Sequence, residues 1–261
     1  MQHARAQTSP RIRVPRRLKA PDAAGVIIQR RDRCVTAILG HPRISAAVAR
    51  KLIELIEEIE DDDAILMLAI TSAGSTFCTG FDREVDPNLV ETIAALAKPT
   101  LAIINGDAFD EGLELALALD LRIAAGSARF AITQPRRGLM PHFGGTQRLP
   151  RIVGAPAALT MLLTGEPINA REAVRLGLVT RSARTAAEFR RLADRTKKEI
   201  LSRGPLSALM VKEAVLKGYD MTLAQGIRLE EDLYALLQTT ADRSAGIDAF
   251  LNKRKPLFKG V

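Results

Sequence analysis

Continuous apolar runs alternate with segments of helical period over the first half of the chain, and this alternation constrains the fold most. Residues 65–71 (ILMLAIT) and 100–104 (TLAII) are uninterrupted apolar runs that end at glycine-containing turns. Apolar residues recur at helical spacing over residues 45–60, where Ser45 is a suitable N-cap. Runs that are apolar on both faces are typical of strands buried in a parallel sheet. The pattern predicts an α/β protein with a largely parallel sheet system.

The two ends of the chain differ from this region. Residues 26–39 contain two short β-type runs separated by a polar RRDR turn. Beyond Thr146 the pattern is helical, and glycine or proline separates the segments. The predicted helices of this part are residues 154–163, 169–176, 185–202, 205–217 and 222–239.

The organisation predicted from these patterns has three parts. Residues 1–22 form a flexible basic tail, in which six Arg and Lys residues precede the first acid, Asp22. Residues 23–195 form the α/β core, and residues 196–261 form a helical C-terminal module. A targeting peptide or a nucleic-acid-binding arm is the alternative interpretation of the tail.

Composition excludes several classes of protein. Two cysteines, Cys34 and Cys78, are too few for a disulfide framework, and the three histidines are too far apart for a metal site. Charged residues interrupt every apolar stretch before it reaches the roughly 18 residues of a membrane span. We therefore expect no metal, no membrane segment and a reducing, cytoplasmic location. The net charge of +8 suits an anionic ligand but does not choose among anions.

Two glycine turns follow buried strands, at residues 77–82 (FCTGFD) and 106–114 (GDAFDEGLE). The second turn leads into a helix, whose first N–H groups lack intrahelical acceptors and attract negative charge. If the turns converge, one N–H from each would form an oxyanion hole. Such turns are common, so this pattern alone leaves a structural role open.

Longer motifs run from about residue 26 to the end of the chain. Residues 77–82 resemble the F-C-A-G-A-D loop of the crotonase (enoyl-CoA hydratase/isomerase) family, and residues 98–130 resemble its K-P-x-I-A-A-x-N-G stretch. GLMPHFGGTQRLPRIVG at residues 138–154 and LTGEPINAREAVRLGLV at residues 163–179 are similar to two further family motifs. AFLNKRKPLFKG at residues 249–260 resembles the family's C-terminal motif.

The resemblance implies a fold, a function and partners. The fold would be a crotonase-like ββα spiral core with a C-terminal helical assembly module. The function would be that of an acyl-CoA-processing lyase or isomerase, most similar to enoyl-CoA hydratase. The partner would be an acyl-CoA thioester, with coenzyme A entering as part of the substrate and no other cofactor. The assembly would be a homotrimer or a dimer of trimers.

The resemblance also assigns the reacting groups. It places the two oxyanion amides at Phe81 and Glu111, and the family's first catalytic glutamate at Glu114. The position of the second glutamate is Gln134. In the family, the amides hold the thioester oxygen while carboxylates move protons and water at the α and β carbons.

Other residues are implied to bind the substrate or its coenzyme. Gly80, Asp82 and Gly112 adjoin the two amides. His142 stands where the family has glycine, close to the reacting water, and is a candidate proton carrier or a loop residue that fills space. In the C-terminal motif, Lys253 and Lys255 are implied to contact the coenzyme A phosphates.

Departures from the family pattern concern the chemistry itself. Gln134 cannot exchange a proton, and a positioned acid–base group is worth roughly 10²–10⁴ in rate. Asp110 and Glu111 replace two usual glycines, and acids beside a developing enolate oppose it unless their side chains point away. On this reasoning Glu111→Gly should leave function unchanged or improved.

Two alternatives to an active enzyme remain. One is a catalytically impaired paralogue that binds acyl-CoA or assembles with relatives, which the altered positions favour. The other is an RNA-binding homologue, which the basic charge permits, although nucleic acid is the less favoured partner. Shortened loops at residues 41–45 and between residues 82 and 98 leave the acyl group undefined.

Overall fold

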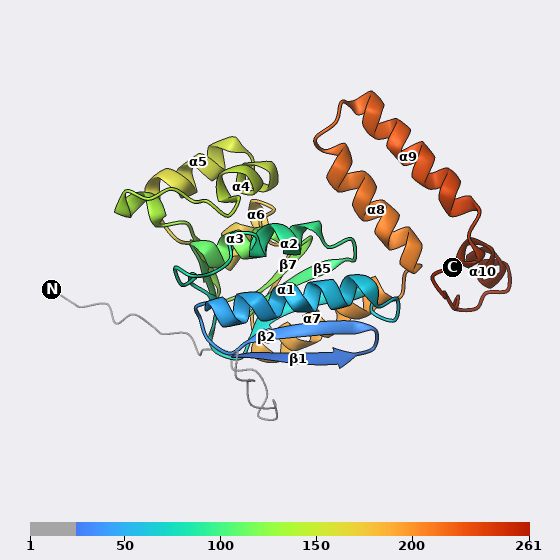
Figure 1. Cartoon of the computed structure of the whole chain (residues 1–261), viewed down its shortest axis with the longest axis horizontal. Coiled ribbons are helices and arrows are strands. Elements are labelled where there is room, and N and C mark those ends of the chain that lie inside the picture. The colour runs from blue at the N-terminus through green and yellow to red at the C-terminus, as the bar shows by residue number, and fades with distance from the viewer. Residues whose placement is uncertain (1–24) are drawn as a thin grey trace.

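The computed structural model describes residues 25–261, so the predicted basic tail at residues 1–22 lies outside the described residues (Figure 1). The strands are β1 (Val26–Arg31), β2 (Cys34–Leu39), β3 (Met67–Ser72), β4 (Thr76–Cys78), β5 (Thr100–Ile104), β6 (Asp107–Phe109), β7 (Leu121–Ala125), β8 (Arg129–Ala131), β9 (Ile168–Asn169) and β10 (Arg181–Ala183). The helices are α1 (Ala46–Asp61), α2 (Leu89–Ala95), α3 (Glu111–Ala118), the 3₁₀ helix η1 (Gln134–Arg137), α4 (Gly145–Val153), α5 (Ala155–Thr164), α6 (Ala170–Arg175), α7 (Ala186–Leu201), α8 (Pro205–Gly218), α9 (Leu223–Gln238) and α10 (Ala241–Leu251).

The strands form two sheets that the chain visits in turn. The larger sheet has the order β1-β2-β3-β5-β7-β10, and only its β1–β2 pair is antiparallel. The smaller sheet has the order β4-β6-β8-β9. In each of the consecutive pairs β3/β4, β5/β6 and β7/β8, the first strand joins the larger sheet and the second joins the smaller one. A helix follows each pair. This repeated strand–strand–helix unit is the predicted ββα spiral.

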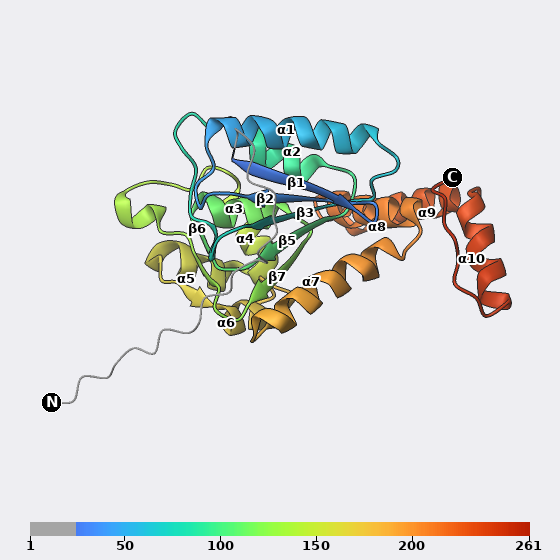
Figure 2. The same cartoon turned by 90° about the horizontal axis from the view of Figure 1, so that it is seen from below.

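The larger sheet is buried on both faces because its strands are apolar throughout. In β3, Leu68 and Ile70 point to the main core, while Met67 and Ala69 point to a second apolar cluster on the other face. Helix α7 covers that second face with residues that include Phe189, whereas α1 lies on the opposite side of the sheet (Figure 2). Burial on both faces explains why the sequence of this strand shows no polar alternation.

Most elements begin and end as predicted. Ser45 caps α1, since its side chain accepts a hydrogen bond from Val48 N. The turn predicted at residues 30–33 is shorter than expected, since Arg30 and Arg31 belong to β1 and only Asp32 and Arg33 join it to β2. Two expectations need correction. Helix α3 starts at Glu111, within the turn predicted at residues 106–114, and the region beyond Thr146 contains the short strands β9 and β10 as well as helices. Two- and three-residue strands have no periodicity of their own, because they form only by pairing with a distant neighbour.

The C-terminal helices project from the core. Helices α8 and α9 form a hairpin that points away from the sheets, and α10 lies at the far end of the molecule from α4 and α5 (Figure 1). The predicted boundary at residues 195/196 falls within α7, which packs on the core through Phe189 and Leu192. The chain leaves the core after α7, at the turn that precedes Pro205. None of the helices within residues 25–261 carries an apolar stretch long enough to traverse a bilayer.

One largely buried lysine joins α8 to the core. Lys212 Nζ donates to Leu96 O (2.7 Å) and Lys98 O (3.0 Å), and lies 2.9 Å from Asp120 Oδ2. The Asp120 carboxylate also accepts from Thr100 N at 2.7 Å. The lysine therefore satisfies carbonyls at the end of α2 and balances a carboxylate that is largely removed from water.

We expect Lys212→Met to destabilise the protein by about 2 kcal/mol, because it leaves a mostly buried carboxylate without its cation. Chemical denaturation of the variant, compared with Lys198→Met at an exposed lysine of α7, measures the effect. A loss equal to that of the control would show that the link contributes nothing to α8 docking.

Candidate active site

The two predicted glycine turns pack against each other. A β-carbon added to Gly112, in the first turn of α3, would lie 2.8 Å from Cys78 Cβ and closer still to the Cys78 carbonyl oxygen. A β-carbon on Gly80 would lie 3.1 Å from Glu111 Oε2. Glycine at residue 112 thus lets the start of α3 approach the 77–82 turn. The proximity expected from the sequence is present.

Two backbone N–H groups at this junction are left available. Residues 44 and 81 form a parallel bridge, in which Ile44 N donates to Gly80 O (3.1 Å) and Asp82 N donates to Ile44 O (2.9 Å). The N–H of Phe81 therefore points away from Ile44. Glu111 is the first residue of α3, so its N–H has no acceptor within the helix. These are the two amides that the sequence motifs select.

Glu114 is fully buried at the centre of the site. Its Oε1 accepts hydrogen bonds from Phe143 N (2.9 Å) and Gly145 N (2.8 Å), at the start of α4. Burial raises the pKa of the Glu114 carboxyl, the two N–H groups oppose that rise, and Glu111 adds to it. Oε1 is thus held by the backbone, and Oε2 is the oxygen left for chemistry.

Gln134 stands between two carboxylates. Its Nε2 lies 3.3 Å from Glu114 Oε2 and 3.4 Å from Glu111 Oε1. The side chain is buried (1% exposed), and its Oε1 has no hydrogen-bond partner in the part of the chain that the structure describes. An amide placed between two acceptors directs its NH₂ group to them and leaves its oxygen to accept from a third molecule.

Asp110 turns away from the reacting groups. Its carboxylate accepts from Thr133 N and, at 2.9 Å, from Thr133 Oγ1, and Arg137 Nη2 donates to it at 3.0 Å. Its backbone φ of 50° lies in the region that favours glycine. The side chain stabilises the turn and ties the start of α3 to the residue before Gln134, so its charge is neutralised locally. Nothing in its sequence motif predicts these contacts.

Arg43 is a further residue that the sequence did not identify. Its Nη2 donates to Phe81 O, and its Nε donates to Asp82 Oδ1 at 3.1 Å. Its Nη1 lies 2.6 Å from where a Gly80 β-carbon would be. The side chain therefore covers the outer surface of the 77–82 turn. It comes from the shortened 41–45 loop, where family motifs gave no position with which to compare it.

Aromatic rings close one side of the site. The Phe81 and Phe143 rings meet edge to face at 5.0 Å, and the exposed His142 ring lies 4.2 Å from that of Phe143. Cys78 is buried in the same turn as Phe81, and burial raises the pKa of its thiol to about 12. The thiol is therefore protonated at neutral pH, which agrees with a packing role and not with a nucleophile.

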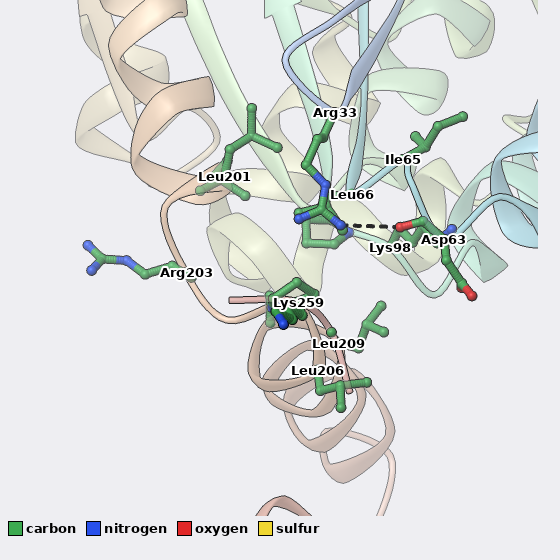
Figure 3. Close-up of a pocket in the computed structure, with 15 residues that line it drawn as sticks. Arg33, Asp63, Ile65, Leu66, Lys98, Leu201, Arg203, Leu206, Leu209 and Lys259 are labelled. Carbon is green, nitrogen blue, oxygen red and sulfur yellow. Dashed lines mark hydrogen bonds between the residues drawn. The ribbon is translucent and has the colours of Figure 1, made fainter. Parts of the chain in front are cut away.

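Two predicted residues lie elsewhere in this chain. Lys253 and Lys255 are exposed beyond α10, which is far from α3 in both views of the molecule (Figures 1 and 2). A hollow near that end, between the core and α8, contains none of the candidate site residues (Figure 3). Two of the cations that line it are engaged: Lys98 Nζ donates to Ile59 O (2.6 Å), and Arg33 Nη2 donates to Asp63 O (3.3 Å). This hollow is a junction between the core and the C-terminal helices.

Comparisons with known proteins agree with this fold. The model of the enoyl-CoA hydratase/isomerase family matches residues 41–261. The (E)-benzylidenesuccinyl-CoA hydratase of Thauera aromatica is 38% identical over 225 residues, which cover 80% of this chain and 88% of that protein. The 2,3-dehydroadipyl-CoA hydratase of Escherichia coli is 34% identical over 255 residues, which cover 90% of this chain and 98% of that protein. The crystal structure of an enoyl-CoA hydratase from Bacillus anthracis matches with a TM-score of 0.87 and 30% identity. That match covers 91% of this chain and 100% of the crystallised chain.

The chain belongs to the enoyl-CoA hydratase/isomerase, or crotonase, family. The predicted α/β spiral fold is confirmed, and so is an acyl-CoA-processing enzymatic function of the enoyl-CoA hydratase type.

Proposed function

We propose that this protein adds water to the double bond of an enoyl-CoA thioester. The observation that carries the proposal is the buried Glu114 carboxylate in the first turn of α3, which the backbone amides of Phe143 and Gly145 hold. Phe81 N and Glu111 N would donate to the thioester oxygen. Negative charge develops on that oxygen as the enolate forms, so these amides bind the transition state more tightly than the substrate.

The water would be held by Glu114 and Gln134 together. One water O–H donates to Glu114 Oε2 and the other to the unpartnered Gln134 Oε1, which directs a lone pair of the water toward the β-carbon. Glu114 takes the first proton as the oxygen–carbon bond forms. Gln134 thus positions the water although its amide cannot act as an acid or a base. Coenzyme A takes part only as the carrier of the acyl group.

The decisive experiment is an activity panel on the purified full chain. Short, long, cyclic, aromatic and carboxylated enoyl-CoAs test hydration through loss of the conjugated thioester absorbance, and 3-enoyl-CoAs test double-bond isomerisation. Aromatic and carboxylated substrates belong in the panel because relatives are named for benzylidenesuccinyl-CoA and 2,3-dehydroadipyl-CoA. Micromolar binding without turnover of any substrate would favour the catalytically impaired paralogue.

The pH profile should report Glu114. The water-activating form is the ionised carboxylate, and burial raises the pKa of Glu114 above its ordinary value of 4.5. We expect kcat/KM to fall with decreasing pH at a higher pH than an ordinary glutamate would produce. A kcat/KM that stays constant down to about pH 4.5 would contradict this assignment.

We propose that the C-terminal helices mediate self-association into a homotrimer or a dimer of trimers. Val211, Val215 and Tyr219 form an exposed stripe along α8, and Ile247 and Phe250 are exposed on α10. Exposed apolar stripes of this kind usually mark a surface that another protein chain covers.

Light scattering during gel filtration tests the assembly. We expect a trimeric or hexameric mass for the wild type and a smaller mass for Val215→Asp. A monomeric wild type would contradict the proposal.

In an assembly, Lys253 and Lys255 would reach the coenzyme A phosphates of a neighbouring copy, and charge reversal at both should raise KM more than it lowers kcat.

The location that we propose is the cytoplasm. A family member of Arabidopsis thaliana is named as mitochondrial, and the basic segment at residues 1–22 leaves import as the competing outcome. Fractionation of cells that express the full chain decides between them.

RNA binding is the least favoured function, and loss of RNA from the protein at moderate salt would agree with that ranking.

A further inference from the structure

We propose that the side chain of Glu111 supplies the second acid–base carboxyl of the site, the function that Gln134 cannot perform. The inference rests on the proposed hydration. It gives Glu111 two roles, with its backbone N–H on the thioester oxygen and its carboxyl at the α-carbon.

The first observation that supports the proposal is the position of the Glu111 carboxyl. Glu111 Oε1 lies 3.4 Å from Gln134 Nε2, and Oε2 lies 3.1 Å from where a Gly80 β-carbon would be. The carboxyl therefore spans from the residue that replaces the second glutamate to the residue that precedes the Phe81 amide. The α-carbon of a bound thioester is one bond from the carbonyl carbon whose oxygen that amide holds, so it lies within this span.

The second observation is that Asp110 and Glu111 have different surroundings. Asp110 is engaged by Thr133 and Arg137, and is therefore unavailable for proton transfer. Glu111 makes no ion pair among residues 25–261: Arg43 Nη1 lies near the same point beside Gly80, but Arg43 pairs with Asp82. The Glu111 side chain is half-buried, so it can exchange protons with solvent. Of the two acids that replace the family's glycines, only Glu111 faces the reacting groups.

The protons balance when the step is written in the dehydration direction. The Glu111 carboxylate takes the α-proton of the 3-hydroxyacyl-CoA, and the electron pair of that C–H bond passes through the enolate to form the double bond. The β-hydroxyl leaves as water with the proton that Glu114 carries, which agrees with the direction in which burial moves the pKa of Glu114. Hydration is the reverse of this step, and between dehydration turnovers Glu111 gives one proton to solvent while Glu114 takes one up.

The proposal reverses the expectation from sequence that the side chain at residue 111 is dispensable. That expectation assumed that the carboxyl would point away from the site, as Asp110 does. The contact between Glu111 and Gln134 shows that it does not.

The test exchanges the two functional groups. Glu111→Gln removes the carboxyl, and the double variant Glu111→Gln/Gln134→Glu returns a carboxyl at the other position. Two rates are measured with the enoyl-CoA that the wild type hydrates best: hydration, and exchange of the α-hydrogen of the product with deuterium from solvent. Glu57→Gln, an exposed change on α1, is the control, and circular dichroism and thermal unfolding verify folding.

We expect Glu111→Gln to lower both rates about 100-fold and the double variant to recover most of the loss. Unchanged or faster rates in Glu111→Gln would overturn the proposal, as would a double variant no better than the single one. An inactive wild type would instead contradict the proposed hydration, and the assignment of Glu111 with it. A wild type that is active beside an equally active Glu111→Gln contradicts this assignment alone.

Discussion

Glu114→Gln should lower kcat/KM for enoyl-CoA hydration by roughly 10²–10⁴-fold, because it removes the one carboxylate within residues 25–261 that is fully buried beside the proposed water. The substitution keeps the shape of the side chain. The new amide oxygen can still accept from Phe143 N and Gly145 N, so the position of α4 should not change. Steady-state kinetics of the variant beside Glu57→Gln measure the effect. Activity within tenfold of wild type would exclude Glu114 as the water-activating base.

The same substitution should stabilise the fold at neutral and alkaline pH. Burial raises the pKa of Glu114, so the folded protein holds this proton more tightly than the unfolded chain does. The resulting stability is fully present below the unfolded-state pKa and is lost as pH rises through the higher folded-state pKa. Glutamine carries no charge and avoids that loss.

Thermal unfolding as a function of pH tests this second effect. The variant should have the higher Tm near pH 8, and the difference should shrink toward about pH 4. Lower activity together with higher stability is the pattern expected where a buried charge is kept for catalysis. A variant less stable than wild type at every pH would show that the carboxylate is a structural hydrogen-bond acceptor above all.

Gly112→Ala should impair both stability and catalysis. The added methyl group would lie 2.8 Å from Cys78 Cβ and closer to the Cys78 carbonyl oxygen, which is backbone and cannot move alone. The start of α3 must therefore shift away from the 77–82 turn. We expect a stability loss of about 1–3 kcal/mol. Since that shift separates the Phe81 and Glu111 amides, we also expect roughly 10²-fold slower turnover.

Gly74→Ala is the matched control for this prediction. Gly74 is exposed in the loop before β4, and the nearest atom to an added β-carbon is Thr76 N at 4.0 Å. It should leave both quantities nearly unchanged. Full activity in Gly112→Ala would mean that the two turns do not act together on one oxygen. A stable but slow variant would support a positional role for the junction.

Long elements with strong patterns were predictable from the sequence. Helix α1, strand β3 and strand β5 follow from apolar spacing and length alone, because each buries a face that its own residues define. The three-residue strands β6 and β8 were not predictable. Their backbone groups pair with each other across successive turns of the spiral, and no local pattern encodes that pairing.

At the site, the sequence by itself determined the types of group and their order along the chain. The motifs select Glu114, Gln134 and the amides of residues 81 and 111, and they show that an amide replaces one carboxylate. Only the tertiary structure decided where the side chains go: Asp110 toward Thr133 and Arg137, and Glu111 toward Gln134. The reason is physical. A motif records which residue occupies a position, whereas the direction of a flexible acidic side chain depends on donors that the fold brings from more than twenty residues away.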